Sequence, residues 1–205
     1  MRSVVKRVNF DDLKFDICEN VYEPSDDTFL FTENLDVKAG DQVLDVGTGC
    51  GILAILAAKK ASSVIAIDIN PYAVHCAKEN AILNRVQNTF FIQKDLFSAL
   101  NQKAKFDLIL FNAPYLPSEE KEMDSWIGRS WAGGKTGRQV IDRFIPSSPK
   151  HLSSSGRILL LQSTLANVDA TFRRFEEYNL KPTIKAERAL PFFETISLIE
   201  AKHNE

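Results

Sequence analysis

The stretch Val43-Leu44-Asp45-Val46-Gly47-Thr48-Gly49-Cys50-Gly51 decides the fold class of this chain. Its first four residues are mostly apolar, as in a buried strand, and the apolar run that starts at Ile52 predicts a helix directly after the glycines. Glycines in such a turn let the backbone bend tightly and approach a ligand without a Cβ atom in the way. A glycine-rich turn between a strand and a helix is typical of α/β domains that bind a nucleoside.

Outward from this turn, short apolar runs alternate with helical stretches, which is the pattern of βαβ units around a parallel sheet. The sequence predicts strands at 42–46, 64–67, 90–93, 107–111 and 157–162, helices at 52–60, 70–84, 138–151 and 168–178, a loop over 116–137, and a closing antiparallel pair at 183–189 and 195–201. We therefore predict an α/β fold with a mostly parallel seven-stranded sheet, an antiparallel last strand and helices on both faces. Because no repeat or linker is evident, we expect residues 1–205 to form a single domain.

The composition limits the classes of function. Lysines and arginines number 25 against 27 aspartates and glutamates, and a net charge of −2 is a poor balance for binding phosphate backbones. The three cysteines share no metal-ligand spacing, so we expect neither a disulfide framework nor a metal site. No apolar stretch is long enough for a membrane span, and residues 1–7 lack the apolar core of a signal peptide. We therefore expect a cytoplasmic protein that does not enter a membrane.

Three aspartates indicate the chemistry of the ligand. The glycine spacing is Gly-x-Gly-x-Gly, and Asp45 at the strand end would repel a pyrophosphate but can face the sulfonium and ammonium groups of S-adenosylmethionine. Asp68 ends the next strand, where a carboxylate can accept from both ribose hydroxyls, and Asp95 could accept from an adenine amino group. The alternative is that each aspartate only ends a strand and caps a helix. The predicted cofactor contacts from this set are Asp45, Gly47, Gly49, Gly51, Asp68 and Asp95.

This ordered set resembles the class I S-adenosylmethionine-dependent methyltransferases over residues 20–200. The resemblance implies their Rossmann-like fold and S-adenosyl-L-methionine as the cofactor.

A second motif, Asn112-Ala113-Pro114-Tyr115, follows the fourth predicted strand and should face the same crevice. It resembles the Asn-Pro-Pro-Tyr signature of methyltransferases that modify a planar nitrogen, which is a glutamine amide or an exocyclic amine of adenine or guanine. The resemblance implies that the Asn112 side-chain oxygen and the Ala113 carbonyl accept the two N–H bonds, while Tyr115 stacks on the plane. Ala113 replaces the first proline, although Pro114 still favours an extended conformation at Ala113. The alternative is an ordinary turn at the end of a strand.

Residues 1–40 precede the alternating pattern. We expect an edge strand at Val4–Phe10 and a helix that opens at Ser25 with a capping hydroxyl. The segment Val21–Leu30 resembles the cofactor-covering segment of the HemK-related glutamine methyltransferases, in their short eukaryotic and archaeal branch, as do residues 130–138 and 142–144. The resemblance implies that Glu23, Pro24 and Thr28 lie along the methionine end of the cofactor, and that Asn112 also contacts it. The alternative is that Ser25–Thr28 merely caps a helix.

Members of this branch methylate the glutamine of the Gly-Gly-Gln loop in the class-1 translation release factor, so the resemblance implies that activity and substrate here. It also implies a small zinc-binding activator subunit that covers an apolar sheet edge, and contact with nucleic acid only indirectly. Two alternatives stay open: methylation of an exocyclic amine of adenine or guanine in RNA or DNA, and a non-catalytic partner protein that binds the cofactor. Trp131 is either a substrate lid or a packed anchor of its loop.

Overall fold

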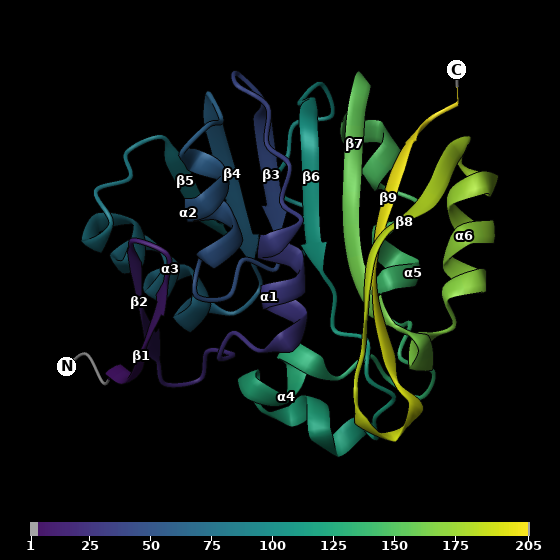
Figure 1. Cartoon of the computed structure of the whole chain (residues 1–205), viewed down its shortest axis with the longest axis horizontal. Coiled ribbons are helices and arrows are strands. Elements are labelled where there is room, and N and C mark those ends of the chain that lie inside the picture. The colour runs from purple at the N-terminus through teal and green to yellow at the C-terminus, as the bar shows by residue number, and fades with distance from the viewer. Residues whose placement is uncertain (1–3, 205) are drawn as a thin grey trace.

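Seven strands form one sheet in the spatial order β5-β4-β3-β6-β7-β9-β8 (Figure 1). The structure is a computed structural model, and it describes residues 4–204; residues 1–3 and 205 of the predicted domain lie outside the described residues. The strands are β3 (Gln42–Val46), β4 (Ser63–Asp68), β5 (Thr89–Gln93), β6 (Phe106–Asn112), β7 (Leu152–Ser163), β8 (Leu180–Ala189) and β9 (Thr195–His203). Parallel pairing joins β5 through β7, whereas β9 is antiparallel to both β7 and β8. The predicted sheet and its closing antiparallel pair are confirmed.

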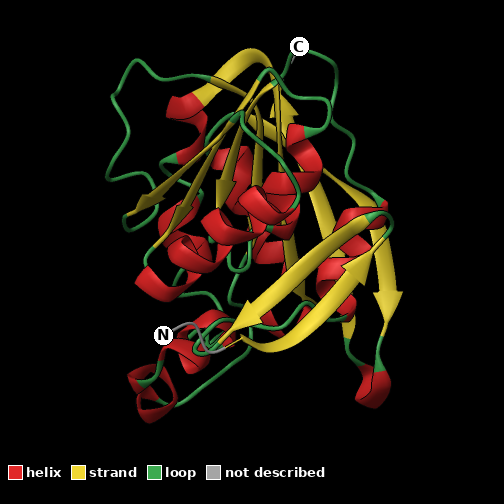
Figure 2. Ribbon diagram, turned by 90° about the vertical axis from the view of Figure 1, so that its left-hand side faces the viewer, coloured by secondary structure: helices red, strands yellow, loops and turns green. Residues whose placement is uncertain are grey.

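Two buried cores lie on opposite faces of this sheet, because successive side chains of a strand point to opposite sides. Val43 and Leu108 pack with residues of the first three helices, while Leu44 and Ile109 pack with Phe144 of α5 and with α6. Helices therefore cover both faces, as predicted (Figure 2). The helices are α1 (Asp26–Glu33), α2 (Ile52–Ala58), α3 (Pro71–Leu83), α4 (Trp126–Trp131), α5 (Ile141–Phe144) and α6 (Val168–Glu177).

The order of the strands creates a crevice at one place. The chain runs outward from β3 through β4 to β5 and then returns to add β6 on the other side of β3. In parallel open sheets a ligand binds beyond the carboxyl ends of the strands at such a reversal. The glycine turn after β3 and the Asn112 motif after β6 both start at this point.

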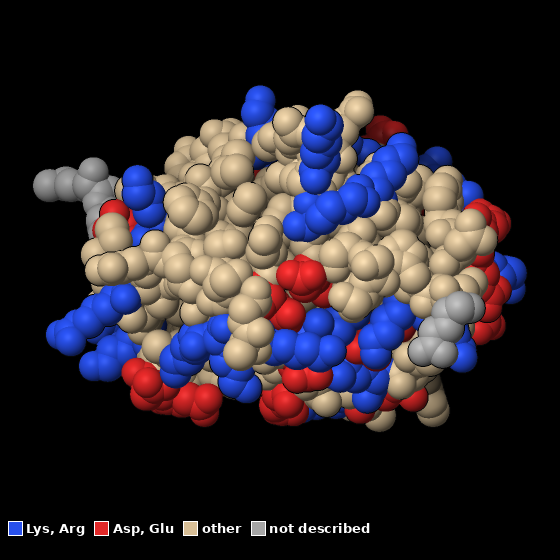
Figure 3. All heavy atoms as spheres, turned by 90° about the horizontal axis from the view of Figure 1, so that it is seen from above, with Lys and Arg blue, Asp and Glu red and all other residues tan. Residues whose placement is uncertain are grey.

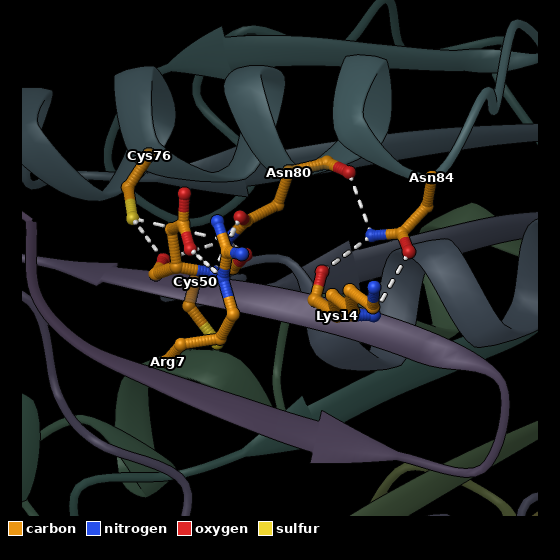
Figure 4. Close-up of polar contacts among 7 residues, drawn as sticks. Arg7, Lys14, Cys50, Cys76, Asn80 and Asn84 are labelled. Carbon is orange, nitrogen blue, oxygen red and sulfur yellow. Dashed lines mark hydrogen bonds and ion pairs between the residues drawn. The ribbon is translucent and has the colours of Figure 1, made fainter.

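The strand predicted at Val4–Phe10 is confirmed with these bounds, but it is not an edge of the seven-stranded sheet. β1 (Val4–Phe10) pairs with β2 (Leu13–Cys18) in a separate antiparallel hairpin, which stands in front of the sheet in Figure 2. Two side-chain amides, one in α3 and one at its C-cap, hold the backbone of β2, as a neighbouring strand would do (Figure 4). Asn80 exchanges hydrogen bonds of 2.8 and 2.9 Å with the backbone of Asp16, and Asn84 exchanges bonds of 3.0 and 2.7 Å with that of Lys14.

The helix predicted over 138–151 is broken. Only α5 (Ile141–Phe144) is α-helical there, and a short 3-10 helix, η2 (Ser148–His151), follows it. Pro146 and Pro149 account for the break, because a proline has no N–H to donate and its ring crowds the preceding turn. By contrast, α3 begins as predicted, with the Asn70 side chain accepting from the backbone of Tyr72 at 2.9 Å.

The loop predicted over 116–137 contains α4 and a 3-10 helix, η1 (Glu120–Asp124). Two further 3-10 helices are η3 (Thr164–Ala166) and η4 (Pro191–Phe193). Within residues 4–204, none of the helices combines the length and the apolar character needed to cross a bilayer. The end of the molecule away from α4 carries basic and acidic side chains side by side (Figure 3).

Candidate active site

A cavity of about 340 Å³ opens beyond the carboxyl ends of β3, β4 and β6, where the strand order reverses. Residues of α1 and α4 close it from the side opposite the sheet, and α4 lies just below these strand ends in Figure 1. Ten of the predicted site residues line this cavity, and they are Pro24, Thr28, Gly47, Gly49, Asp68, Asp95, Asn112, Ala113, Pro114 and Tyr115. Residues more than 80 positions apart in the sequence are thus brought into one wall.

The glycines of the turn differ in what they face, since two line the cavity and one packs against a neighbouring helix. Gly47 and Gly49 have φ of +70° and +57° and line the cavity. Gly51, with φ of +88°, is the N-cap residue directly before α2, and a Cβ atom there would lie 2.9 Å from the Cβ of Ala77 in α3. Among residues 4–204, Gly51 is not one of those that line the cavity. Gly51 therefore permits two helices to approach, which is a different task from the one the sequence predicts.

The carboxylates at the strand ends also differ in position. Asp68 lines the cavity, and its two oxygens accept from the backbone N–H groups of Gly49 at 2.9 Å and Asn70 at 2.8 Å. Burial raises its pKa. Asp95 lines the cavity as well, in an ion pair with Arg143, another wall residue that the sequence did not indicate. A ligand that donates to Asp95 would share its carboxylate with that arginine.

Asp45 is fully buried behind the turn and is not among the described wall residues. One of its oxygens accepts from the Thr48 hydroxyl at 2.7 Å, and the other has no hydrogen-bond partner among residues 4–204. Burial raises the pKa of Asp45 to about 7. A positive charge on a ligand at the turn would favour its ionised form.

The N-terminal segment contributes unequally. Pro24 and Thr28 line the cavity, whereas Glu23 forms a surface ion pair with Lys6 of β1 and is outside the described wall. Ser25 occupies the position before α1, but its side chain makes no capping hydrogen bond, so that predicted cap was wrong. The carboxylate of Asp27 accepts from the Thr28 backbone at 2.5 Å instead.

The Asn112 motif meets this segment inside the cavity. Asn112 donates its side-chain NH₂ to Asp27 at 3.3 Å, and the Tyr115 hydroxyl donates to the same carboxylate oxygen at 3.4 Å. The Asn112 Oδ1 atom is buried and has no partner within the described chain. Desolvation, with the negative charge of Asp27, raises the pKa of Tyr115, so its hydroxyl stays protonated at neutral pH. Asn112 is therefore a wall residue whose side-chain oxygen is shielded from solvent and lacks a donor.

Sequence reasoning missed Asp27. A signal was present, because Asp27 shares one helical face with Leu30 and Phe31, which are three and four positions later and buried. Trp131 is predicted to be either a substrate lid or a packed anchor of its loop. It lines the cavity, and its carbonyl accepts from the backbone of Leu116 at 3.0 Å.

Known proteins resemble the chain over most of its length. A Methanocaldococcus jannaschii protein named as a protein N5-glutamine methyltransferase is 43% identical over 190 residues, which cover 91% of this chain and 94% of that protein. The chain belongs to the protein N5-glutamine methyltransferase family. Methyltransferase HEMK2 of Homo sapiens is 33% identical over 181 residues, covering 82% of this chain and 84% of its own, and a family model described as ribosomal protein L11 methyltransferase (PrmA) matches residues 27–113.

Among solved structures, the chain is similar to that of the E. cuniculi Mtq2-Trm112 complex, described as responsible for methylation of the eRF1 translation termination factor. The TM-score is 0.72 at 27% identity, over 90% of this chain and 99% of that one. These findings confirm the predicted class I methyltransferase fold and the resemblance to the short archaeal and eukaryotic branch of the glutamine methyltransferases.

S-adenosylmethionine is the cofactor of this methyltransferase family, and the cavity fits it. A Cβ atom at Gly49 would meet nothing within 4 Å, so the turn leaves open space for a ligand. Each oxygen of Asp68 accepts one backbone N–H and keeps a second lone pair that could accept a ribose hydroxyl. The buried Asp45 lies behind the turn, and a cationic ligand there would favour its ionised form. These donors and acceptors suit a cationic nucleoside.

Proposed function

We propose that this chain methylates the side-chain amide nitrogen of glutamine in the Gly-Gly-Gln loop of a class-1 translation release factor. The observation that carries the proposal is Asn112 Oδ1, a buried acceptor without a partner among residues 4–204, in the wall of the cofactor cavity. A buried acceptor left unsatisfied costs about 1–3 kcal/mol, and the N–H of a bound amide would remove that cost. The relatives named as glutamine methyltransferases support the same substrate class.

The proposed chemistry needs positioning more than a base. S-adenosylmethionine supplies an electrophilic methyl group when it is bound. An amide nitrogen is a weak nucleophile because its lone pair is delocalised, so its two N–H bonds must be held in a fixed plane. The Asn112 Oδ1 atom and the Ala113 carbonyl are the proposed acceptors, and the Tyr115 ring is the proposed stacking face. Alignment of the nitrogen with the methyl group is then the main contribution of these residues.

We further propose that Pro24, Thr28, Gly47, Gly49, Asp68 and Asp95 contact the cofactor, since each lines the cavity. Asp45 would act from behind the turn through its charge. For Glu23 and Gly51 the positions described above favour structural roles, with Glu23 paired to Lys6 and Gly51 packed on Ala77.

A labelled methyl group distinguishes the candidate substrates. In three separate reactions, purified protein and isotope-labelled S-adenosylmethionine are incubated with release factor, with total RNA or with DNA. We expect label in release factor alone, and none when the glutamine of its Gly-Gly-Gln loop is replaced. Label in nucleic acid but not in protein would overturn the proposal in favour of a base amine. Equal labelling by the wild type and N112A would remove the proposed role of Asn112.

We also propose a small zinc-binding partner subunit on the free edge of β5. Phe90 on this strand is 59% exposed, and Ile82 at the end of the adjacent α3 is 63% exposed. Exposed apolar side chains that cluster at a sheet edge are typical of an interaction surface. The similar chain of known structure is in a complex with a second protein, Trm112.

The partner proposal is tested by co-purification of a Trm112-type protein from the source organism with this chain. F90D should lose the partner, while I184D, which alters an exposed apolar residue on the opposite edge strand, β8, should keep it. Retention of the partner by F90D would contradict the proposed surface. Because release factors act in translation, we propose the cytoplasm as the compartment of the reaction.

A further inference from the structure

The carboxylate of Asp27 connects the two halves of the cavity wall. Asp27 lies in the first turn of α1 and is 7% exposed. One of its oxygens accepts from the backbone N–H and the hydroxyl of Thr28, at 2.5 and 3.1 Å. The other faces the Asn112 NH₂ group at 3.3 Å and the Tyr115 hydroxyl at 3.4 Å. These donors are all neutral, and the Asn112 contact spans 85 positions of sequence.

A carboxylate beside a carboxamide decides which way the carboxamide points. The two ends of a carboxamide are nearly equal in shape, but one end only donates and the other only accepts. A carboxylate only accepts, so the NH₂ end of Asn112 must face Asp27. Its Oδ1 atom then points away from Asp27, where it is buried and has no partner within the described chain. With the opposite orientation, the NH₂ group would face the N–H bonds of an incoming amide.

We propose that Asp27 is a positioning residue that fixes the orientation of the Asn112 carboxamide and the Tyr115 hydroxyl for the substrate amide. This inference rests on the proposed function, because it assigns Asn112 the task of accepting an N–H. The contacts of 3.3 and 3.4 Å are long for hydrogen bonds, and such contacts often shorten when a ligand is bound. Asp27 does not itself touch the reacting atoms in this arrangement.

A purely structural role accounts poorly for a carboxylate here. Burying a charged group is unfavourable for folding unless it is well paired, and the donors to Asp27 among the described residues are all uncharged. An asparagine would fit the same space and could still accept from Thr28. It could not, however, force the orientation of a second carboxamide, because two carboxamides can pair in either sense.

The test reverses the polarity of the pair. In D27N the orientation of Asn112 is no longer fixed, and in N112D two carboxylates face each other. The double variant D27N/N112D restores one amide, one carboxylate and the original total charge, with an acceptor oxygen at residue 112 again directed away from residue 27. D26N is the control, since Asp26 is the adjacent aspartate and its side chain is 67% exposed.

Each variant is assayed for kcat and KM on a Gly-Gly-Gln peptide, and for cofactor affinity by calorimetry. We expect D27N to lower kcat roughly 10-fold or more, with the cofactor Kd and the melting temperature nearly unchanged and D26N equal to the wild type. The double variant should exceed, roughly 10-fold, the kcat expected if the two single effects simply multiplied. Wild-type kcat in D27N, or multiplication of the two effects, would overturn the inference while leaving the proposed function intact.

A second readout does not depend on turnover. The side-chain NH₂ signal of Asn112 in ¹⁵N-labelled protein is assigned by its loss in N112D. We expect slow hydrogen exchange of these protons in the wild type and in D26N, and fast exchange in D27N. Equal exchange in the wild type and D27N would contradict the contact, even if the peptide proved not to be the substrate.

Discussion

Val46 and Phe111 are register partners at the ends of the parallel strands β3 and β6. The residue after Val46 starts the glycine turn, and the residue after Phe111 is Asn112. This pairing brings the cofactor turn and the amide-holding motif to one cavity, although 65 positions of sequence separate the two partners. The relationship explains why two short motifs can form one methyl-transfer site.

Substitutions at Gly51 and Gly49 should differ in their main effect, which is on stability at Gly51 and on cofactor binding at Gly49. G51A places a Cβ atom 2.9 Å from Ala77 at a φ of +88°, so we expect a loss of about 1–3 kcal/mol in the free energy of unfolding. The Cβ atom of G49A meets nothing within 4 Å, but it narrows the cavity. We therefore expect G49A to weaken cofactor binding and to lose less stability than G51A. Urea unfolding and calorimetric titration check the two effects. The reverse ranking of stability losses would contradict the assignment of Gly51 to packing.

Asp45 should make the stability of the ligand-free protein depend on pH. Its pKa is raised from 3.8 to about 7 in the folded protein, so between these values the unfolded chain binds fewer protons than the folded one. Stability from this group is therefore present below about pH 4 and is lost as the pH rises through about 7. The melting temperature of the wild type, compared with that of D45N, should fall over this range. An unchanged difference between the two from pH 4 to 8 would count against a protonated Asp45.

The hairpin anchors Asn80 and Asn84 should differ in energetic weight (Figure 4). Asn80 is fully buried and bonds both Asp16 and the backbone carbonyl of Cys50 in the cofactor turn, at 2.9 Å. N80A leaves these groups unsatisfied, so we expect a loss of about 2–3 kcal/mol in stability and weaker cofactor binding. N84A removes more exposed bonds and should cost about 1 kcal/mol or less. Denaturant unfolding of the two variants provides the comparison, and equal losses would refute the coupling of the hairpin to the turn.

Ala113 occupies the position where the family signature has a proline. Its backbone N–H makes a hydrogen bond, so the substitution A113P should have a measurable effect. The Ala113 N–H donates to the Leu161 carbonyl at 3.3 Å, a bond that a proline cannot make. We therefore expect A113P to lose about 1 kcal/mol in stability. A proline also restricts the preceding Asn112, so kcat should be retained or raised. A large fall in kcat with unchanged stability would show that the alanine serves catalysis directly.

The sheet and the cavity were predictable because their signals are local. Apolar runs, the glycine turn and the Asn70-Pro71 helix start each act within a few residues, and Pro146 could have warned against a continuous helix over 138–151. The first strand of the hairpin was predicted, but β2 was not, because side chains of Asn80 and Asn84 hold it on one side in place of a strand. The place of Asp27 on the buried face of α1 was a local signal, but its partners, Asn112 and Tyr115, are brought to it only by the tertiary fold.

The central claim is that Asn112 presents an acceptor to a glutamine amide beside the cofactor turn. Its most direct test is tandem mass spectrometry of a release factor after incubation with the wild-type protein, any partner subunit and S-adenosylmethionine. The account predicts one added methyl group on the side-chain nitrogen of the Gly-Gly-Gln glutamine, which is absent with N112A although that variant still binds the cofactor. An unmodified glutamine, or the same modification with N112A, would contradict it.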